Sequence, residues 1–572
     1  MTLWGAVVAR FRVLTSVVSL GYNIFDLPRT ETVIIERGEQ CMSFDIEQFL
    51  AVAQRIYRKA GADGRLVDNP STEELYRMVK QEPGVMISAF GNICVDSEPN
   101  SRAAMFTKNN VDDQFGRAEE ELLRQCESCL SREELVCHDF LVGDGAQGTT
   151  ARVIVPKQFA HLAYAGENQF GHALGRVEKP TYTVIFFTDD AFELNRTQPL
   201  PKKDITIRLA FLPDGRMVKI VRNSNYFGEL KKGVFAAEDW AAKAKRRGIF
   251  LHAGCRADYL QQSHGDYQWV RSLLIALSAN GKTTTTCRVL AWKDHELSWL
   301  VQDDGGTLMP DGSFYGFESG GIFVKTDGLN PRDQRETYYG ALKPATFFEN
   351  VWLEPNGIFD FYNSEKTSNG RAVILRRDFM HASQNINVDG VDNLILITRG
   401  PSIPAICRLT KEQAAAFMVL GQAMQSSAGD PTQAGKIISE FFYDPFIAGD
   451  RAEHANIFYE IIKRLPNLRC FLINTGNVGE GTRFRDITLN DTMGILDSLC
   501  RGGLEDWEPN ANVGFEVPRA IRTVDPVLVH PEKLYSSANF AKRQEELKKA
   551  RVEAIESVGS GLHPEIRNVF CP

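Results

Sequence analysis

The stretch LSANGKTTTT has the residue types of a phosphate-binding loop. It follows an apolar run, WVRSLLIAL, that predicts a buried strand, and it contains Gly281, Lys282 and Thr283 in succession. In such a loop, backbone N–H groups turn towards phosphate oxygens, and a lysine and a hydroxyl residue open the next helix. The positions where two further glycines are usual hold Ala276 and Ala279. A tight turn entering a threonine-rich helix is therefore the alternative interpretation.

A pair of carboxylates follows about 20 residues downstream of this loop. Asp303 and Asp304 end the apolar run LSWLVQ and are followed by two glycines. A carboxylate at the end of such a strand can reach a cation that is bound to nucleotide phosphates. Two acids at a strand end also occur in simple turns, but together with the Gly-Lys-Thr sequence they favour a nucleotide site.

Two upstream segments carry residue types that bind metal ions. NYFGELKKGVF contains Tyr226, Lys231 and Lys232, and IFLHAG presents His252 at the end of an apolar run. With Asp304, Lys232 and His252 would form a mixed nitrogen and oxygen site suited to an ion such as Mn²⁺. The lysine must be neutral to bind, and the metal and a neighbouring cation both favour loss of its proton. The alternative is a surface lysine and a histidine satisfied within the core.

The elements that position these residues fall into two regions. The runs RVIVP, TYTVIFF, ITIRLAFL and MVKIVR predict strands between residues 135 and 235, and strand, loop and helix alternate from about residue 250. A length of 572 residues is enough for two large lobes, and the boundary is expected near KAKRRG. FAKRQEELKKARVEAIESVG predicts a surface helix packed by Phe540, Leu547, Val552 and Ile555.

Composition limits the classes of function. A net charge of −8 argues against a general nucleic-acid binder, because phosphate contacts need a basic face. The apolar N-terminal run is broken by Arg10 and Arg12, and no segment reaches the roughly 18 uninterrupted apolar residues of a spanning helix. We therefore expect a cytoplasmic protein without a membrane partner.

The cysteines raise one further possibility. Cys126, Cys129, Cys137 and His138 are spaced closely enough to bind zinc, but the first pair lies in a helix-like run and the second in a strand-like run. The pairs can then face apart, and a structural role is the favoured interpretation. Eleven cysteines, an odd number, also disfavour a complete disulfide framework.

A longer series of segments resembles one known family. In order along the chain it comprises YFGELKKGVF, IFLHAG, LSANGKTTTT, DDGG, FESGGIFVKT, FFENVWLEPNGIFDF, KTSNGRAV, LILITRGPSIPAICRLT, FLINTGNVGEGTRF and ITLNDT. These segments, from about residue 225 to 495, resemble the ATP-dependent phosphoenolpyruvate carboxykinase family. GNICVDSEPNSRAAMF and ELVCHDFLVGDG extend the resemblance more faintly towards the N-terminus. The series is far more specific than Gly-Lys-Thr alone.

The resemblance implies a two-lobed carboxykinase-like α/β fold. Its C-terminal lobe, residues 247–572, would contain the P-loop and bind mononucleotide and metal. Its mixed-sheet N-terminal lobe, residues 1–246, would lie on the substrate side and begin with an extension over residues 1–30. A mobile lid is expected near residues 426–440.

The resemblance also implies metal ligands. Lys232, His252 and Asp304 match the positions of the family's Mn²⁺ ligands. Thr283 matches the hydroxyl that helps to bind the Mg²⁺ that accompanies ATP. The expected cofactors are therefore ATP, Mg²⁺ and Mn²⁺.

Further residues are implied for phosphoryl transfer and substrate binding. Lys282 matches a lysine that bridges the phosphates, and Lys325 a second lysine near the γ-phosphate. Arg371 matches an arginine that contacts the transferred phosphoryl group and the substrate, and Tyr226 an aromatic residue beside the organic acid. Lys231 adds positive charge. Phosphoryl transfer relies on positioning and on cations around the developing charge, and these residues supply both.

The nucleotide contacts come from two places. Arg483, Phe484 and Thr492 fall where the family holds adenine and ribose, although the segment between them is longer than usual. The loop expected around the phosphates comprises Ser278, Ala279, Asn280, Gly281, Lys282, Thr283 and Thr284.

The implied reaction is decarboxylation of oxaloacetate and phosphorylation of the resulting enolate by ATP, which gives phosphoenolpyruvate and CO₂. The expected partners are these small molecules, and the expected assembly is a monomer or small homo-oligomer. The family's basic substrate motif appears here as NSRAAMFTK, in which Arg102 is the retained cation. A phosphotransferase for another small acid, or a non-catalytic nucleotide-binding protein, are the alternatives.

Overall fold

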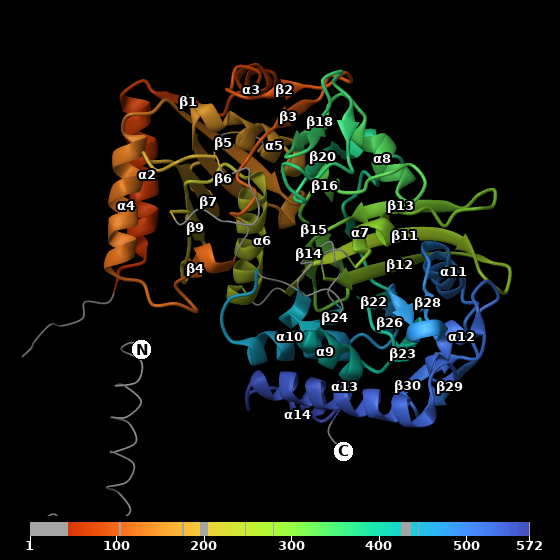
Figure 1. Ribbon diagram of the computed structural model, residues 1–572. Helices are drawn as coiled ribbons and strands as arrows, with labels where there is room; N and C mark the ends of the chain where they lie inside the picture. The colour runs from red at the N-terminus through yellow and green to blue at the C-terminus, as the bar shows by residue number, and fades with distance from the viewer. Residues whose placement is uncertain are drawn as a thin grey trace, which may run out of the picture. The chain divides into compact units, whose positions relative to one another are not determined.

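A computed structural model describes residues 44–101, 104–173, 175, 177–194, 204–245, 248–277, 280–424, 436–443 and 446–570 (Figure 1). The predicted N-terminal extension, Arg102, Ser278 and Ala279 lie outside these ranges, as does most of the predicted lid. Residues 45–572 form one compact unit in which helices and strands alternate around several mixed sheets. The mixed α/β class predicted from the sequence is confirmed.

A seven-stranded sheet gathers strands from the first half of the chain. The four strands predicted between residues 135 and 235 are present as β6 to β9, and every residue of β7 is buried, as expected for a central strand. β6, β7 and β9 run parallel to one another. β5 is antiparallel to β6 but parallel to β1, and β8 is antiparallel to β9 but parallel to β4. The order is β1 (Leu66–Asp68), β5 (Leu135–Val142), β6 (Thr149–Pro156), β7 (Tyr182–Phe187), β9 (Met217–Arg222), β8 (Thr206–Phe211) and β4 (Thr107–Asn109).

Helices cover both faces of this sheet. Figure 1 shows α2 and α4 together on one side of the strands and α5 and α6 on the other. α3, near β1 and α5, begins with a capping box from Ser71 and Glu74. The bounds are α2 (Glu47–Ala62), α3 (Thr72–Val79), α4 (Arg117–Leu130), α5 (Ala160–Phe170) and α6 (Phe227–Ala244).

An eight-stranded sheet organises the second half of the chain. β12, β22 and β26 run parallel at its centre, and their carboxyl ends meet at one edge. The order is β13 (Leu297–Gln302), β11 (Ala253–Gln261), β12 (Tyr267–Ala276), β22 (Asn393–Thr398), β26 (Arg469–Asn474), β23 (Ile406–Leu409), β30 (Phe515–Pro518) and β29 (Trp507–Asn510). Ligands of α/β sheets bind outside such carboxyl ends.

Two smaller sheets connect these regions. One has the order β16 (Gly321–Lys325), β20 (Arg371–Leu375), β17 (Phe347–Glu349), β3 (Ile93–Val95) and β2 (Met86–Ile87). The other has the order β10 (Ile249–Leu251), β14 (Gly306–Leu308), β15 (Phe314–Gly316) and β21 (Asn387–Val388). Short hairpins pair β18 (Trp352–Leu353) with β19 (Phe359–Asp360), β24 (Gln422–Met424) with β25 (Ile437–Ser439), and β27 (Asn477–Val478) with β28 (Arg485–Asp486).

Of the remaining helices, α7 follows the phosphate-loop sequence and α8 packs against β20 of a smaller sheet. α9 packs on β22, β23 and β26 of the second large sheet, and α10, α13 and α14 pack against α9. The predicted C-terminal surface helix is confirmed as α13, which buries Phe540, Leu547 and Ile555 and leaves Val552 half-buried. The bounds are α7 (Lys282–Cys287), α8 (Arg335–Ala341), α9 (Lys411–Leu420), α10 (Arg451–Lys463), α11 (Leu489–Cys500), α12 (Pro526–Val529), α13 (Ser537–Ser557) and α14 (Pro564–Arg567).

Two large hydrophobic cores lie beneath these layers. One is formed by residues between 249 and 566, and the other mainly by residues between 75 and 250. The lobe boundary between residues 246 and 247 stays a prediction. Among the described helices, none combines the length and apolar character that crossing a bilayer requires.

The three cysteines of the candidate zinc group lie on two different elements. Cys126 is buried on α4, Cys129 is half-buried on the same helix, and Cys137 is buried on β5. In the described part of the chain, none of these thiols belongs to a group of side chains placed to bind a metal ion, and the structural role stays a prediction. His138 does belong to such a group, with partners other than the cysteines.

Candidate active site

A cavity of about 560 Å³ lies where the predicted site residues converge. Residues from α6, α7 and the ends of β10, β13, β16 and β20 form its walls. Its lining includes eleven residues that the sequence analysis singled out: Tyr226, Lys231, Lys232, His252, Gly281, Lys282, Thr283, Thr284, Asp304, Lys325 and Arg371. The lining is completed by Asp327, Arg399, Glu440, Phe446 and several uncharged residues.

The phosphate-loop sequence lies between β12 and α7. Gly281 has a φ of 90°, a left-handed conformation that favours glycine, and its carbonyl accepts from the N–H of Thr285 at 2.9 Å. Ala276 is a fully buried strand residue paired with Ile397 of β22. An extended strand position accepts alanine without strain, so the missing first glycine carries no backbone cost here. Ala279 lies outside the described residues.

A buried arginine holds α7 in place. Arg256 is only 1% exposed, donates to both carboxylate oxygens of Asp258 at 2.7 and 2.8 Å, and donates to the carbonyl of Thr285 at 2.7 Å. Ser298 donates to the same carboxylate at 2.6 Å. A buried charge needs this degree of pairing to be tolerated. The network therefore fixes the helix that carries Lys282.

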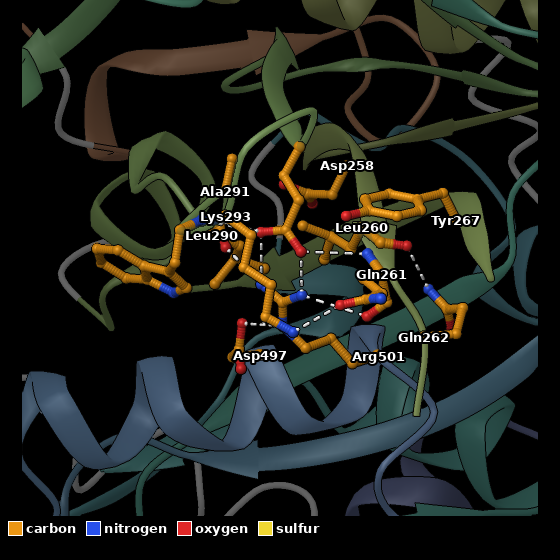
Figure 2. A network of polar contacts seen from close by, with 12 residues as sticks. Asp258, Leu260, Gln261, Gln262, Tyr267, Leu290, Ala291, Lys293, Asp497 and Arg501 are labelled. Atoms are coloured by element: carbon orange, nitrogen blue, oxygen red, sulfur yellow. Dashed lines mark hydrogen bonds and ion pairs between the residues drawn. The ribbon is translucent and has the colours of Figure 1, made fainter. Parts of the chain in front are cut away.

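A second arginine fixes the segment that follows α7. Figure 2 shows Arg501 beside Asp497, Leu290 and Gln261. Arg501 donates to the Asp497 carboxylate at 2.7 Å and to the Leu290 carbonyl at 2.9 Å, and it also pairs with Glu296. Burial opposes ionisation of Glu296, but its bonds to Arg501 and to backbone N–H groups lower its pKa to about 2. This network ties the turn after α7 to the end of α11.

Asp304 is the centre of charge in the cavity. Its carboxylate accepts from Lys231 and Lys282, and the Nε2 atom of His252 lies 2.8 Å from its Oδ1 atom. Burial alone would raise the pKa of Asp304, but Lys231, Lys282 and His252 outweigh burial and hold that pKa well below its usual range. The donor set fits a divalent ion, since an ionised oxygen and an imidazole nitrogen already face one another.

The two adjacent lysines of α6 point to different partners. Lys231 is buried and pairs with Asp304 and, at 3.1 Å, with Glu318. Lys232 is more exposed and pairs with Glu229. Adjacent helical residues face directions about 100° apart, which separates the two ammonium groups. Lys232 lines the same cavity as His252 and Asp304, and its role as a metal ligand stays a prediction.

A second acidic pair lies behind Asp304. Asp303 and Glu318 are buried, and each has a carboxylate oxygen without a hydrogen-bond partner among the described residues. Burial and the neighbouring carboxylate raise the pKa of Asp303 well above its usual range, and burial raises the pKa of Glu318. The two acids of the DDGG sequence thus differ, because Asp304 faces the cavity cations while Asp303 turns inward.

Lys325 and Arg371 stand side by side on the opposite wall. They are register partners on the antiparallel strands β16 and β20. Lys325 pairs with Asp327 at 2.9 Å, and the guanidinium of Arg371 lies 5.9 Å from the ring centre of Phe323. The ammonium of Lys231 lies 4.7 Å from the same ring. Phe323 therefore separates two cations within the cavity wall.

Other predicted residues lie outside the cavity lining. Arg483 and Phe484 are exposed near the β27–β28 hairpin, and Thr492 is buried in α11 with its hydroxyl bonded to the Thr488 carbonyl at 3.2 Å. Asn280 is buried beside the loop, and its carbonyl accepts from Thr475 at 2.8 Å. The proposed adenine and ribose contacts of Arg483, Phe484 and Thr492 stay predictions.

The sequence analysis missed Arg399 and Glu440. Burial lowers the pKa of Arg399, and its Nε atom is buried without a hydrogen-bond partner in the described ranges. Burial likewise raises the pKa of Glu440. Arg399 directly follows β22, next to the strand that leads into the phosphate loop, and this position at a parallel strand's carboxyl end is the signal that would have found it.

The cavity carries an excess of positive charge. Its lining holds six lysine and arginine side chains, Lys231, Lys232, Lys282, Lys325, Arg371 and Arg399, against three carboxylates, Asp304, Asp327 and Glu440. A concave, cation-rich surface favours a polyanionic ligand. Fold and site together define a mixed α/β protein with a cation-rich cavity at the ends of its strands.

Comparison with known proteins identifies the family. A family model described as phosphoenolpyruvate carboxykinase matches residues 65–526, so the chain belongs to this family. The resemblance inferred from the sequence is confirmed.

Three similar relatives share one name, phosphoenolpyruvate carboxykinase (ATP). The relative from Aeropyrum pernix is 29% identical over 60% of this chain and 67% of its own length. Those from Mesorhizobium japonicum and Allorhizobium ampelinum are each 28% identical, over 64% and 56% of this chain and 65% and 58% of their own lengths. The alignments thus span about two thirds or less of these relatives.

Proposed function

We propose that this protein converts oxaloacetate and ATP into phosphoenolpyruvate, CO₂ and ADP. Membership of the phosphoenolpyruvate carboxykinase family supports this, as does the name of its relatives. The observation that carries the proposal is the cavity in which Asp304, His252, Lys282 and Lys231 meet opposite Arg371. These are the charges that phosphoryl transfer to an enolate requires.

The roles of the cations follow from their positions. Lys282, at the start of α7, would neutralise the ATP phosphates, and Lys325 would approach the γ-phosphoryl group. Arg371 would orient that group and the organic acid, with Tyr226 beside the acid. Held by strands and helices, these side chains are positioned before the substrate binds, which is the main source of electrostatic catalysis.

The roles of the metal-binding residues follow in the same way. His252, Asp304 and Lys232 would hold Mn²⁺, and Thr283 would contact the Mg²⁺ of MgATP. Bound there, the transition metal would supply Lewis acidity towards the enolate oxygen and the phosphoryl group. Lys231 keeps Asp304 ionised, and Lys232 would have to leave Glu229 and lose its proton to bind.

The reaction needs no proton-abstracting side chain. Cleavage of the carbon–carbon bond releases CO₂ and leaves its electron pair on the enolate, whose oxygen then takes the γ-phosphoryl group while ADP leaves. The cavity must therefore stabilise the enolate anion and align the enolate oxygen with the γ-phosphoryl group and the leaving oxygen of ADP. Its lysine and arginine side chains are suited to both tasks.

The finer architecture is part of the same proposal. The N-terminal lobe, residues 1–246, would present the substrate side with Arg102, and the C-terminal lobe, residues 247–572, would bind nucleotide through the P-loop. The segment near residues 426–440 would close over the cavity. Glu440 lines that cavity, and this supports placing the segment at its mouth.

The test is phosphoenolpyruvate production by the purified protein from oxaloacetate and MgATP, with and without Mn²⁺. His252→Ala should lower kcat/KM at least about 100-fold, because outer contacts of metal sites alone are worth about 10- to 100-fold. His264→Ala is the matched control, since His264 is an exposed histidine that does not line the cavity. Equal turnover by the two variants would refute the assigned site.

The altered substrate motif NSRAAMFTK favours a second candidate, a phosphotransferase for another small acid. A panel of small carboxylic acids, assayed by ADP release, separates the two. Consumption of ATP with oxaloacetate alone excludes the second candidate, and faster turnover of another acid would replace the first.

A further inference from the structure

Three potential metal ligands converge outside the catalytic cavity. His138 lies on β5, Glu167 on α5 and His172 just after α5. One donor atom from each lies within 4.8 Å of the others. Glu167 Oε2 contacts His138 Nε2 and lies 3.1 Å from His172 Nδ1. None of the three lines the catalytic cavity, and the proposed reaction uses none of them.

The backbone holds these side chains in place. The Leu141 N–H donates to the Gly171 carbonyl at 3.1 Å, and the Ala173 N–H donates to the Asp139 carbonyl at 3.3 Å. His172 forms a β-bridge with Phe140 between these two bonds. The segment that carries His172 is therefore fixed to the strand that carries His138.

The outer contacts orient the ligands as in protein metal sites. Thr72 donates to the second carboxylate oxygen of Glu167, Oε1, at 2.7 Å and leaves Oε2 directed towards both imidazoles. The His138 ring is fully buried and packs 5.1 Å from the Phe140 ring. Hydrogen bonds of this kind to a ligating carboxylate are a common feature of such sites.

The buried imidazole is also free to present a lone pair. His138 Nδ1 is buried and has no hydrogen-bond partner among the described residues. No contact there fixes the tautomer, so the ring can carry its proton on Nδ1 and direct the Nε2 lone pair at the position that Glu167 and His172 share. An ion at that position would replace the protons that otherwise link the three side chains.

We propose that His138, Glu167 and His172 form a second metal site, which binds a zinc-class divalent ion. Two imidazole nitrogens and one carboxylate oxygen suit Zn²⁺ and Co²⁺ better than Mg²⁺ or Ca²⁺, which prefer oxygen. The side chain of His172 is 45% exposed, which gives an ion a route in and leaves room for water as a fourth ligand.

The same helix reaches the wall of the catalytic cavity. Gln169, two residues after Glu167, donates to Glu318 at 2.7 Å, and Glu318 pairs with Lys231. An ion that ties α5 to β5 stabilises the folded state in proportion to its affinity and concentration. Thermal stability is therefore a second readout of binding that does not depend on turnover.

The experiment uses the full chain carrying His252→Ala, which weakens the catalytic metal site. After chelator treatment and dialysis, Co²⁺ is titrated by visible absorption and Zn²⁺ by calorimetry. We expect one bound equivalent with a tetrahedral Co²⁺ spectrum, and a rise in Tm with Zn²⁺. Adding His172→Asn should weaken binding at least tenfold and remove both signals, whereas adding His264→Asn should change neither.

A further variant distinguishes loss of the metal site from misfolding. Glu167→Gln retains a hydrogen-bonding side chain of the same size but lacks the charge, so it should also lose the ion while keeping the circular dichroism spectrum of the parent. Equal Zn²⁺ affinity in the parent and in folded His172→Asn or Glu167→Gln variants would overturn the proposal, as would no binding by the parent.

Discussion

Lys231 forms the ion pair with Asp304, whereas the next residue, Lys232, pairs with Glu229. The two lysines therefore differ in what their loss would do. Lys231 is buried between Asp304 and Glu318 and is paired with both carboxylates. Lys232 is the more exposed of the two, so it can exchange its ion pair with Glu229 for a bond to a metal ion.

Replacement of Lys231 should damage both stability and activity. Lys231→Met leaves the buried Glu318 carboxylate without its cation, while Asp304 keeps Lys282 and His252. Breaking a buried pair costs about 3–5 kcal/mol. Urea unfolding should show this loss in the free energy of unfolding. Lys157→Met is the control, because Lys157 pairs with Glu134 at the surface and such pairs contribute about 0–1 kcal/mol. Equal effects of the two changes would contradict the assigned ion pair.

Replacement of Lys232 should act on metal binding with little effect on folding. Lys232→Met removes a proposed Mn²⁺ ligand, so the Mn²⁺ concentration that gives half-maximal activity should rise at least tenfold. Its free energy of unfolding should fall less than that of Lys231→Met, since Glu229 keeps its ion pair with Lys219 at 2.7 Å. An unchanged Mn²⁺ requirement would exclude Lys232 as a ligand.

Much of the cavity was predictable because its residues lie in short segments with characteristic sequences at the ends of strands. Lys282 and Asp304 were predicted in this way, whereas Lys325 and Arg371 were implied by the family resemblance, and all four line the cavity. The strand positions themselves followed from apolar runs such as TYTVIFF, now β7.

Tertiary contacts account for what was not predictable. Sequence spacing does not show which of two adjacent lysines faces Asp304, because the answer depends on how α6 is rotated about its axis in the fold. Glu440 was missed because it lies in no segment with a phosphate-loop or metal pattern, and only the fold brings it into the cavity. Arg399 was missed although its place at the carboxyl end of a parallel strand was a usable signal. The alanine at position 276 was expected to matter for the loop, but it belongs to β12, where no glycine is needed.

Glu349 gives the protein a specific pH dependence. Burial raises its pKa to about 7, against a usual value of 4.5. The folded state then binds more protons than the unfolded state between these two values, so this residue's contribution to stability falls as the pH rises from about 4.5 to 7. Glu349→Gln retains an acceptor for the Phe227 N–H, which donates to Glu349 at 2.8 Å, and removes the buried charge.

The variant should therefore be more stable than the wild type at pH 8 by up to about 3 kcal/mol, and the difference should vanish near pH 4.5. Urea unfolding at both pH values measures it. Glu354→Gln, which changes a half-buried glutamate, is the control for replacing a carboxylate by an amide. A constant difference between wild type and Glu349→Gln across this range would contradict the raised pKa.

Arg399 should contribute to nucleotide binding. Arg399 lines the same cavity as Leu277 and Gly281 of the loop segment, and burial lowers its pKa. A buried cation of this kind is best stabilised by an anionic ligand, and a hydrogen bond to a charged group is worth about 1.5–3 kcal/mol. Arg399→Gln should thus raise the KM for MgATP by roughly 10- to 100-fold.

The Arg399→Gln substitution should weaken nucleotide binding without changing the stability of the fold or the KM for the organic acid. Arg519→Gln, which alters an exposed arginine paired with Glu508, is the control and should leave the KM for MgATP unchanged. Direct binding of a non-hydrolysable ATP analogue, measured by calorimetry, separates affinity from turnover. If Arg399→Gln bound the analogue as tightly as wild type and instead raised the KM for oxaloacetate, the guanidinium would belong to the substrate side of the cavity.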